Sequence, residues 1–315
     1  MKQDMPLNER GAGAGTQKTG AARVSIISNI SLVLLKLLAG LWTGSVAILS
    51  EAIHSAMDLL AAVMAYVSVR VADKPADFQH PYGHGKAEHL AALFEGVLIV
   101  VAGALIIRQA ARGFAAPEPL PEPGWGALVM LVSAAVNIAV SRFLFRVGRE
   151  TDSSALIADA WHLRTDVYTS LGVFAALGGI LLGRLLAPEL PLAVLDPLCA
   201  ALVALLILKA GVSLCWEAMA QLLDHSLTPQ ELALVQSHIQ QYAPGIKGYG
   251  AVKTRRSGSC RVVYMELLVD GDMPVEQAHA LGERVAESIR EHFPDSQISF
   301  HLEPFSLKAT GPDSE

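Results

Sequence analysis

Charged residues are scarce in this sequence. Asp, Glu, Lys and Arg make up 17% of its 315 residues, whereas soluble domains carry about 25%. Hydrophobic residues make up 52%, and the mean hydropathy is +0.40. This composition is typical of a membrane protein.

Cysteine and clustered basic residues are also rare. The three cysteines, Cys199, Cys215 and Cys260, stand alone, so the sequence has neither a disulfide framework nor a CxxC metal pair. Basic residues form no stripe with interleaved aromatics, and the net charge is -6. Nucleic acid is therefore not an expected partner.

The sequence lacks two motifs that are typical of other classes of membrane protein. An intramembrane metallohydrolase, the main enzyme alternative, would need His-Glu-x-x-His, and a nucleotide-driven pump would need a P-loop. Neither motif occurs in the sequence. Residues 1–20 are polar and glycine-rich and lack the apolar core of a secretory signal, which predicts a disordered tail.

Long apolar segments dominate residues 21–223, and each reaches the roughly 20 residues needed to cross a bilayer. We therefore predict six transmembrane helices, at about 22–42, 45–72, 88–113, 125–147, 153–186 and 195–222. Six crossings place both termini on one side of the membrane. Arg and Lys flank the second and fourth connections, whereas the first carries none, which predicts that both termini are cytoplasmic.

Hydropathy falls after Leu223, and residues 224–305 have the pattern of one small domain. Turn residues and alternating apolar positions separate its predicted elements. These are a helix from Pro229 to about Tyr242, strands at 249–256 and 261–270, a helix from Pro274 to about His292 and a strand at 297–303. The α-β-β-α-β order is typical of an open-faced α+β sandwich. Residues 306–315 are predicted to be a tail.

Two apolar segments each contain a His-x-x-x-Asp pair, His54 with Asp58 and His162 with Asp166. Residues four apart lie on one face of a helix, and ionisable residues at membrane depth are costly enough to suggest a function. Two imidazoles and two carboxylates suit tetrahedral Zn²⁺. A single pair could instead be a structural hydrogen bond, and Arg164 could form an ion pair with one of these carboxylates or with Asp159.

The loop after the second segment contains Asp77, His80 and His84, spaced so that all three could bind one metal ion. Gly83 and Gly85 permit the tight backbone that this requires. The alternative is a solvated polar loop whose histidines face water.

Together these features resemble the cation diffusion facilitator family of divalent metal transporters. The likeness rests on the His-x-x-x-Asp pairs in the second and fifth segments, the loop HPYGHGKAE and the C-terminal α-β-β-α-β pattern, and it spans residues 22–305. It implies a homodimer in the bacterial inner membrane, with a ferredoxin-like cytoplasmic domain. Such a dimer exports divalent metal from the cytosol in exchange for protons, and is not an enzyme.

The resemblance also implies three metal sites. The first, the transport site, comprises His54, Asp58, His162 and Asp166, and the second comprises Asp77, His80 and His84. A third, in the cytoplasmic domain, comprises His279, His301 and Glu303. Its match is partial, because Glu266 and Gly250 stand where well-known bacterial members have histidines. Lys86 and Asp224 correspond to a charge interlock across the dimer.

The resemblance favours Zn²⁺ as the transported ion, because His54 occupies a position where broader-range members carry aspartate. Zn²⁺ would also be the regulatory ion of the cytoplasmic domain. Cd²⁺, Co²⁺ and Fe²⁺ remain open, since the affinities of such ligands overlap. A non-transporting metal sensor or scaffold is the alternative function, although the intact pairs in both segments argue against it.

Overall fold

The computed structural model describes residues 7–43, 46–115, 125–186 and 195–305. The chain divides into two compact units, one within residues 14–219 and one formed mainly by residues 220–305. Each unit is described separately. The predicted tail at 306–315 lies outside the described residues.

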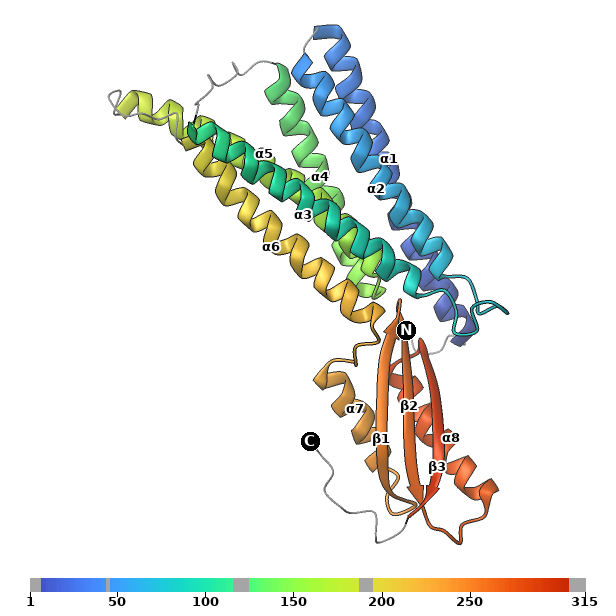
Figure 1. The fold of residues 1–315 in the computed structure, drawn as a ribbon. Coiled ribbons are helices and arrows are strands. Elements are labelled where there is room, and N and C mark those ends of the chain that lie inside the picture. Colours follow the sequence, from blue (N-terminus) through green and yellow to red (C-terminus); the bar gives the residue numbers. More distant parts are fainter. Residues whose placement is uncertain (1–6, 44–45, 116–124, 187–194, 306–315) are drawn as a thin grey trace. The chain divides into compact units, whose positions relative to one another are not determined.

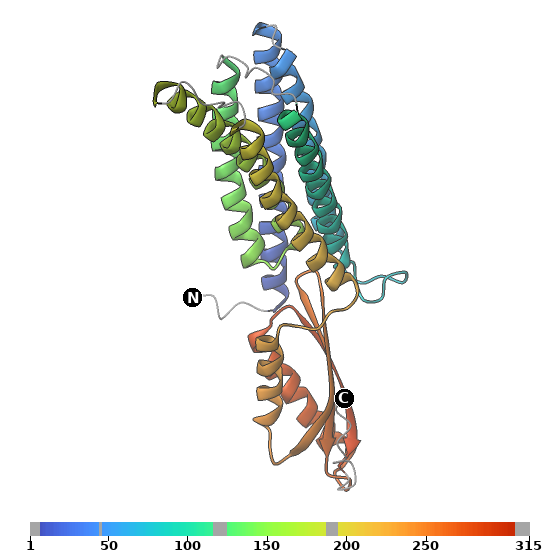
Figure 2. The same cartoon turned by 60° about the vertical axis from the view of Figure 1, so that its left-hand side comes forward.

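The first unit is a bundle of long helices (Figures 1 and 2). They are α1 (Leu7–Thr43), α2 (Val46–Ala72), α3 (Lys86–Ala115), α4 (Trp125–Glu150), α5 (Ser154–Leu186) and α6 (Leu195–Leu222). Helices satisfy their own backbone hydrogen bonds, which makes them suitable for crossing lipid. Four segments of the described chain are long and apolar enough to cross a membrane: Gly15–Trp42, Lys86–Phe114, Leu128–Glu150 and Pro197–Leu222.

The predicted helical membrane domain is thus confirmed, while the count of six crossings stays a prediction. Helices α2 and α5 are the two long helices outside those four segments. They are also the helices that contain the two His-x-x-x-Asp pairs.

The N-terminal segment differs from the sequence prediction. Helix α1 begins at Leu7, within residues 1–20, for which the sequence predicts disorder. Lys18 is buried, and its Nζ lies 3.1 Å from Glu88 Oε1 on α3. Local composition does not predict this contact, because the two residues are 70 apart in the sequence. It gives Lys18, in the N-terminal third of α1, a partner on α3.

Glycines allow α3 and α6 to approach closely. A Cβ added to Gly96 would lie 2.8 Å from Cys215 Sγ and 3.1 Å from Cys215 N. On the facing helix, a Cβ at Gly211 would lie 3.0 Å from Val100 N. Because backbone atoms limit both positions, any side chain there would push the two helices apart.

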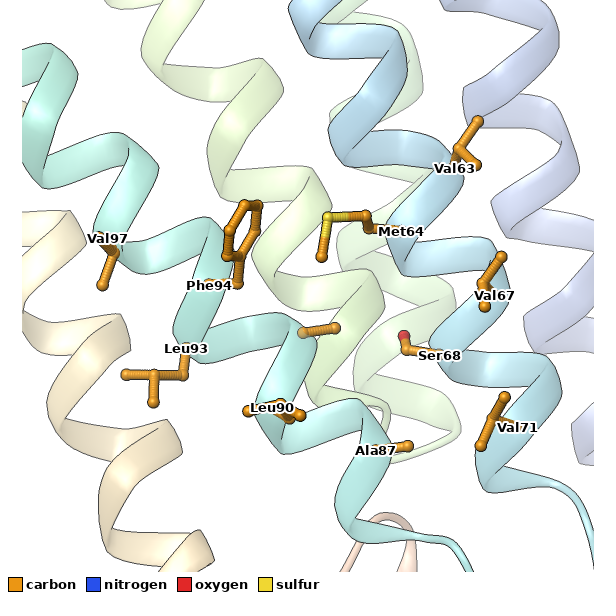
Figure 3. Close-up of a pocket in the computed structure, with 11 residues that line it drawn as sticks. Val63, Met64, Val67, Ser68, Val71, Ala87, Leu90, Leu93, Phe94 and Val97 are labelled. Atoms are coloured by element: carbon orange, nitrogen blue, oxygen red, sulfur yellow. The ribbon is translucent and has the colours of Figure 1, made fainter.

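An apolar groove of about 700 Å³ lies between α2 and α3 (Figure 3). Ser68 is the one polar residue of its lining, and the Ser68 hydroxyl already donates to the Ala65 carbonyl oxygen at 2.8 Å. The other lining residues are Val63, Met64, Val67, Val71, Ala87, Leu90, Ala91, Leu93, Phe94 and Val97. The groove therefore offers no ligand set for a metal ion.

The second unit has the predicted α-β-β-α-β order, in the elements α7 (Pro229–Gln240), β1 (Ile246–Ser257), β2 (Cys260–Val269), α8 (Val275–His292) and β3 (Ser296–Pro304). The sheet order is β1-β2-β3, with β1 antiparallel and β3 parallel to β2. Parallel neighbours need a crossover connection, and α8 provides it.

One face of this sheet carries the core of the unit. Val263, Met265 and Leu267 alternate along β2 and are fully buried. They pack with residues from α7 and α8, including Val235, Val285 and Ile289. Both helices therefore cover the same face (Figure 2), as the open-faced pattern predicts.

Candidate metal centres

The first candidate centre joins α2 and α5. Asp58 on α2 and His162 and Asp166 on α5 each offer a ligand atom, and these atoms lie within 4.8 Å of one another. Asp58 is 12 residues from the start of α2, which places it about 18 Å along the helix, near its middle. His162 and Asp166 are one helical turn apart on α5.

Asp58 and His162 are in direct contact. The distance from His162 Nε2 to Asp58 Oδ1 is 3.2 Å, and the two side chains are 14% and 6% exposed. An ionised carboxylate only accepts, so with Asp58 ionised the Nε2–H group donates this hydrogen bond. Two ligands of a tetrahedral Zn²⁺ stand about 3.4 Å apart, given Zn–N and Zn–O bonds of roughly 2.0–2.2 Å. The observed spacing is close to that value.

The other ring nitrogen of His162 has no hydrogen-bond partner among the described residues, although it is buried. An unpartnered nitrogen leaves the imidazole free to change tautomer when Nε2 is needed for a metal ion. His54 lies on α2 one turn before Asp58, and its side chain lies outside the described residues. The structure thus brings together three of the four predicted ligands.

Arg164 does not pair with the nearby acids in the described part of the chain. Its guanidinium lies over the ring of Phe145, 5.5 Å from the centroid. The carboxylate oxygens of Asp159 have no hydrogen-bond partner among these residues either. The proposed ion pair between Arg164 and Asp159 is therefore absent, and a cation–π contact replaces it.

The second candidate centre is the loop between α2 and α3. Ligand atoms of Asp77, His80 and His84 also lie within 4.8 Å of one another. Asp77 Oδ1 is 3.3 Å from His80 Nδ1, and Asp77 Oδ2 is 3.3 Å from His84 Nε2. The backbone turn depends on Gly83, whose φ of +83° is rarely adopted by other residues.

Hydrogen bonds keep Asp77 ionised. The backbone N–H of His80 donates to Asp77 Oδ1 at 2.7 Å, and that of Gln79 donates at 2.9 Å. The His80 backbone bond is the main cause that lowers the pKa of Asp77, against a smaller opposing effect of burial. The side chain of Asp77 is 53% exposed, and that of His84 is 12% exposed. The loop therefore presents a charged carboxylate between two imidazoles.

The third predicted centre is less compact. His301 and Glu303 are both exposed on β3, with His301 Nε2 3.7 Å from Glu303 Oε1. His279 on α8 instead packs against Phe300, with 5.6 Å between ring centroids. Glu266, opposite His301 on β2, accepts a hydrogen bond from the Ala251 backbone N–H at 2.9 Å. No group of three ligand atoms forms here among the residues described.

The predicted interlock partner Asp224 has a local partner of its own. Its carboxylate Oδ1 lies 3.0 Å from Arg255 Nη1, within the second unit. The interlock with Lys86 would join two copies of the chain, and it stays a prediction.

Lys36, Glu88 and Glu95 are buried polar residues of the first unit that the sequence analysis did not single out. Lys36 on α1 donates to the Ser55 hydroxyl on α2 at 2.7 Å. Glu88 and Glu95 on α3 are both fully buried. Lys36 and Glu95 each stand in an apolar segment as a lone charge, without the i, i+4 partner that marked the histidines, and Glu88 stands at the end of one.

Known families match both parts of the chain. Residues 22–223 match the model of the cation efflux transmembrane domain. Residues 227–305 match the model of the cation efflux protein cytoplasmic domain, which is a dimerisation domain.

Curated relatives match along most of the chain. The uncharacterized transporter sll1263 of Synechocystis is 35% identical over 283 residues, which are 90% of this chain and 89% of the relative. The cation-efflux pump FieF of Citrobacter koseri is 32% identical over 287 residues, which are 91% of this chain and 93% of the relative.

Solved structures match a smaller part. Two structures of CzrB, one of them a Zn form, are 32% and 30% identical to this chain. They cover 25% and 28% of this chain and 99% of their own chains, with TM-scores of 0.25 and 0.26.

Proposed function

Because this chain belongs to the cation efflux family, we propose that it moves Zn²⁺ out of the cytosol in exchange for protons. Its integral membrane domain would lie in the bacterial inner membrane, with both termini in the cytosol. The observation that carries the proposal is the convergence of Asp58, His162 and Asp166 from two helices.

Proton exchange follows from the chemistry of these ligands. Zn²⁺ needs a neutral imidazole and ionised carboxylates, so binding displaces protons and protonation weakens binding. His162 Nε2 faces Asp58 Oδ1 at 3.2 Å, and Zn²⁺ would take the place of the proton shared in this hydrogen bond. At a more acidic outer face, protons would in turn displace Zn²⁺.

The ligand set supports Zn²⁺ over harder cations. Imidazole with carboxylates suits Zn²⁺, whereas Mg²⁺ and Ca²⁺ prefer shells made of oxygen alone. We propose that His54, one turn from Asp58, is the fourth ligand. Rocking of the helices about this site would expose it to each side in turn.

We assign the other two centres supporting roles. Asp77, His80 and His84 would bind a second Zn²⁺ in the loop, where the exposed side chains of Asp77 and His80 give an ion access. His301 and Glu303, with a contribution from His279, would bind a weaker regulatory ion in the cytoplasmic domain.

Transport by reconstituted protein tests the main site. In vesicles with an imposed pH gradient, the wild-type protein should accumulate Zn²⁺. Asp58→Ala and His162→Ala should lower uptake to the level of protein-free vesicles, because each removes a proposed ligand of the transported ion. Glu217→Ala, which removes an exposed carboxylate of α6, should transport normally.

Uptake that persists in both ligand variants would contradict the assignment of this site. A wild-type protein that binds Zn²⁺ without moving it under any gradient would favour the sensor alternative. Parallel measurements with Cd²⁺, Co²⁺ and Fe²⁺ would rank the cations.

A further inference from the structure

Glu95 is a fully buried acid in the middle of the bundle. It belongs to a stripe along α3 formed by Glu88, Ala92, Glu95 and Ile99, each at most 1% exposed. These positions follow helical spacing, so they share one face of α3. Neither carboxylate oxygen of Glu95 has a hydrogen-bond partner among the described residues.

Glu88, on the same stripe, shows how this fold neutralises a buried acid. Glu88 Oε1 lies 3.1 Å from Lys18 Nζ, and its other oxygen accepts a hydrogen bond from the Ser153 hydroxyl at 2.5 Å. Glu95 is seven residues further along α3, about 10.5 Å away. These partners therefore serve Glu88 and not Glu95.

The charged group that faces Glu95 is a second acid. Asp159 on α5 is fully buried, its two oxygens also lack partners within the described structure, and its charge acts on Glu95. From α1, the Ser25 hydroxyl faces Asp159 without completing a hydrogen bond. From α6, Cys215 approaches the backbone of α3, with its Sγ 3.9 Å from the Leu93 carbonyl oxygen.

Two ionised carboxylates in this setting would be costly. Burial removes the water that stabilises a carboxylate, and a neighbouring like charge adds repulsion. His162 and Asp58 also face Asp159, with charges of opposite sign, and the Arg164 guanidinium lies over the Phe145 ring. A proton on one of the two acids removes one charge and with it the repulsion.

We propose that Glu95 holds a proton against Asp159 while the transport site is empty, and releases it when a divalent cation binds there. Asp159 lies three residues before His162, so a cation bound at the transport site would bring positive charge within one turn of this acid pair. This inference rests on the proposed function, and it adds a proton-carrying residue to the exchange.

The release step is a simple ionisation. The O–H bond of Glu95 breaks, the bonding electron pair stays on the carboxylate, and the proton passes to water. The bound cation then balances the charge that the proton had balanced. One cation therefore displaces one proton from Glu95, in addition to any displaced from its own ligands.

Infrared spectroscopy of the zinc-free, full-length protein tests whether the proton is present. The wild-type spectrum should contain a carbonyl band of a protonated carboxylic acid that shifts in D₂O. That band should be missing in Glu95→Gln, shifted in Asp159→Asn and unchanged in the matched control Glu217→Gln. A band that is identical in all four proteins, or absent from the wild type, would overturn the inference.

Proton counting tests the release. On addition of Zn²⁺ to weakly buffered protein in detergent, Glu95→Gln should release one proton fewer per bound ion than the wild type and Glu217→Gln. Equal counts would overturn the inference and leave the transport site untouched. A Glu95→Gln protein that binds one Zn²⁺ fewer would make the pair a metal site, and would also overturn it.

The two proposals fail separately. If the wild-type protein binds no Zn²⁺, the proposed function fails, while the zinc-free infrared spectrum still decides whether Glu95 holds a proton. If Glu95→Gln does not fold, the wild-type and Asp159→Asn spectra provide the same decision.

Discussion

Three buried carboxylates of this chain have three different kinds of neighbour. Glu88 pairs with a lysine, Asp58 accepts a hydrogen bond from a histidine, and Glu95 has another acid as its charged neighbour. The first arrangement joins α1 to α3 through an ion pair. We place the proposed transport chemistry at the other two.

At the same scale, Glu231 gives a pH prediction for the C-terminal unit. Its Oε1 lies 2.6 Å from Arg256 Nη2 and 2.9 Å from Arg261 Nε, and it forms a capping box with Thr228. Burial would raise the pKa of Glu231, but the Arg261 hydrogen bond, the Arg256 charge and Thr228 together lower it to about 2.

The pKa of Glu231 in the fold lies below the ordinary value of 4.5. Ionised Glu231 therefore contributes its full stabilisation at any pH above about 4.5. The contribution is lost as the pH falls from 4.5 toward 2. Glu231→Gln keeps the size and much of the cap, so it should lower the stability of α7 by about 1 kcal/mol at neutral pH. The difference from wild type should shrink in acid.

Amide exchange of α7 in the full-length protein measures this effect. Glu283→Gln is a suitable control, because the Glu283 side chain is 45% exposed and lies 3.7 Å from its partner Arg290. Equal α7 protection in wild type and Glu231→Gln at neutral pH would show that the ion pairs contribute nothing.

At the scale of elements, α3 packs against three other helices. The face with the buried acids lies toward α5, the face with the glycines contacts α6, and a third face borders the groove with α2. A helix that is constrained on several sides tolerates few substitutions. The α3–α6 contact, which depends on missing side chains, is the easiest to test.

Gly96→Ala should destabilise the bundle by about 1–3 kcal/mol. The added Cβ would meet Cys215 Sγ at 2.8 Å and Cys215 N at 3.1 Å, so the helices must separate. Gly20→Ala is the control, because a Cβ there would meet nothing within 4 Å. Alanine favours helix over glycine, so Gly20→Ala should be neutral or slightly stabilising.

Thermal unfolding in detergent compares the two variants. A melting temperature of Gly96→Ala equal to that of Gly20→Ala would contradict the close approach of α3 and α6.

At the scale of the whole molecule, the chain combines a membrane transporter domain with a cytoplasmic dimerisation domain. The chain is therefore a homodimer, with two copies of each candidate centre. In the second unit α7 and α8 cover one sheet face, and residues two apart on β3 share a side. His301 and Glu303 are such a pair, available to an ion outside the membrane domain.

We expect His301→Ala to reduce the number of Zn²⁺ ions bound per full-length chain while preserving uptake by the transport site. His225→Ala, another exposed histidine of the same unit, should bind as the wild type does. Calorimetric titration counts the ions, and vesicle uptake measures transport. Unchanged binding in His301→Ala would remove the regulatory site, and lost uptake would show that it is required for transport.

Sequence alone determined most of the elements, with the start of α1 as the exception. The lengths of the apolar segments predicted the helical membrane domain, and turn residues with alternating apolar positions predicted the α-β-β-α-β order, because these signals are local. The pairs at i and i+4 also predicted which faces of α2 and α5 carry the candidate metal ligands. The family likeness rested on the same short patterns.

Tertiary structure decided which faces meet. Asp58 and His162 are 104 residues apart, and their 3.2 Å contact depends on how α2 and α5 are rotated against each other. The pairing of Lys18 with Glu88 also depends on helix packing, and Lys18 lies in the segment that the sequence predicts to be a tail. The placement of Glu95 near Asp159 depends on packing in the same way. Local sequence patterns do not predict how a helix is rotated about its axis, because that rotation results from the packing of the whole bundle.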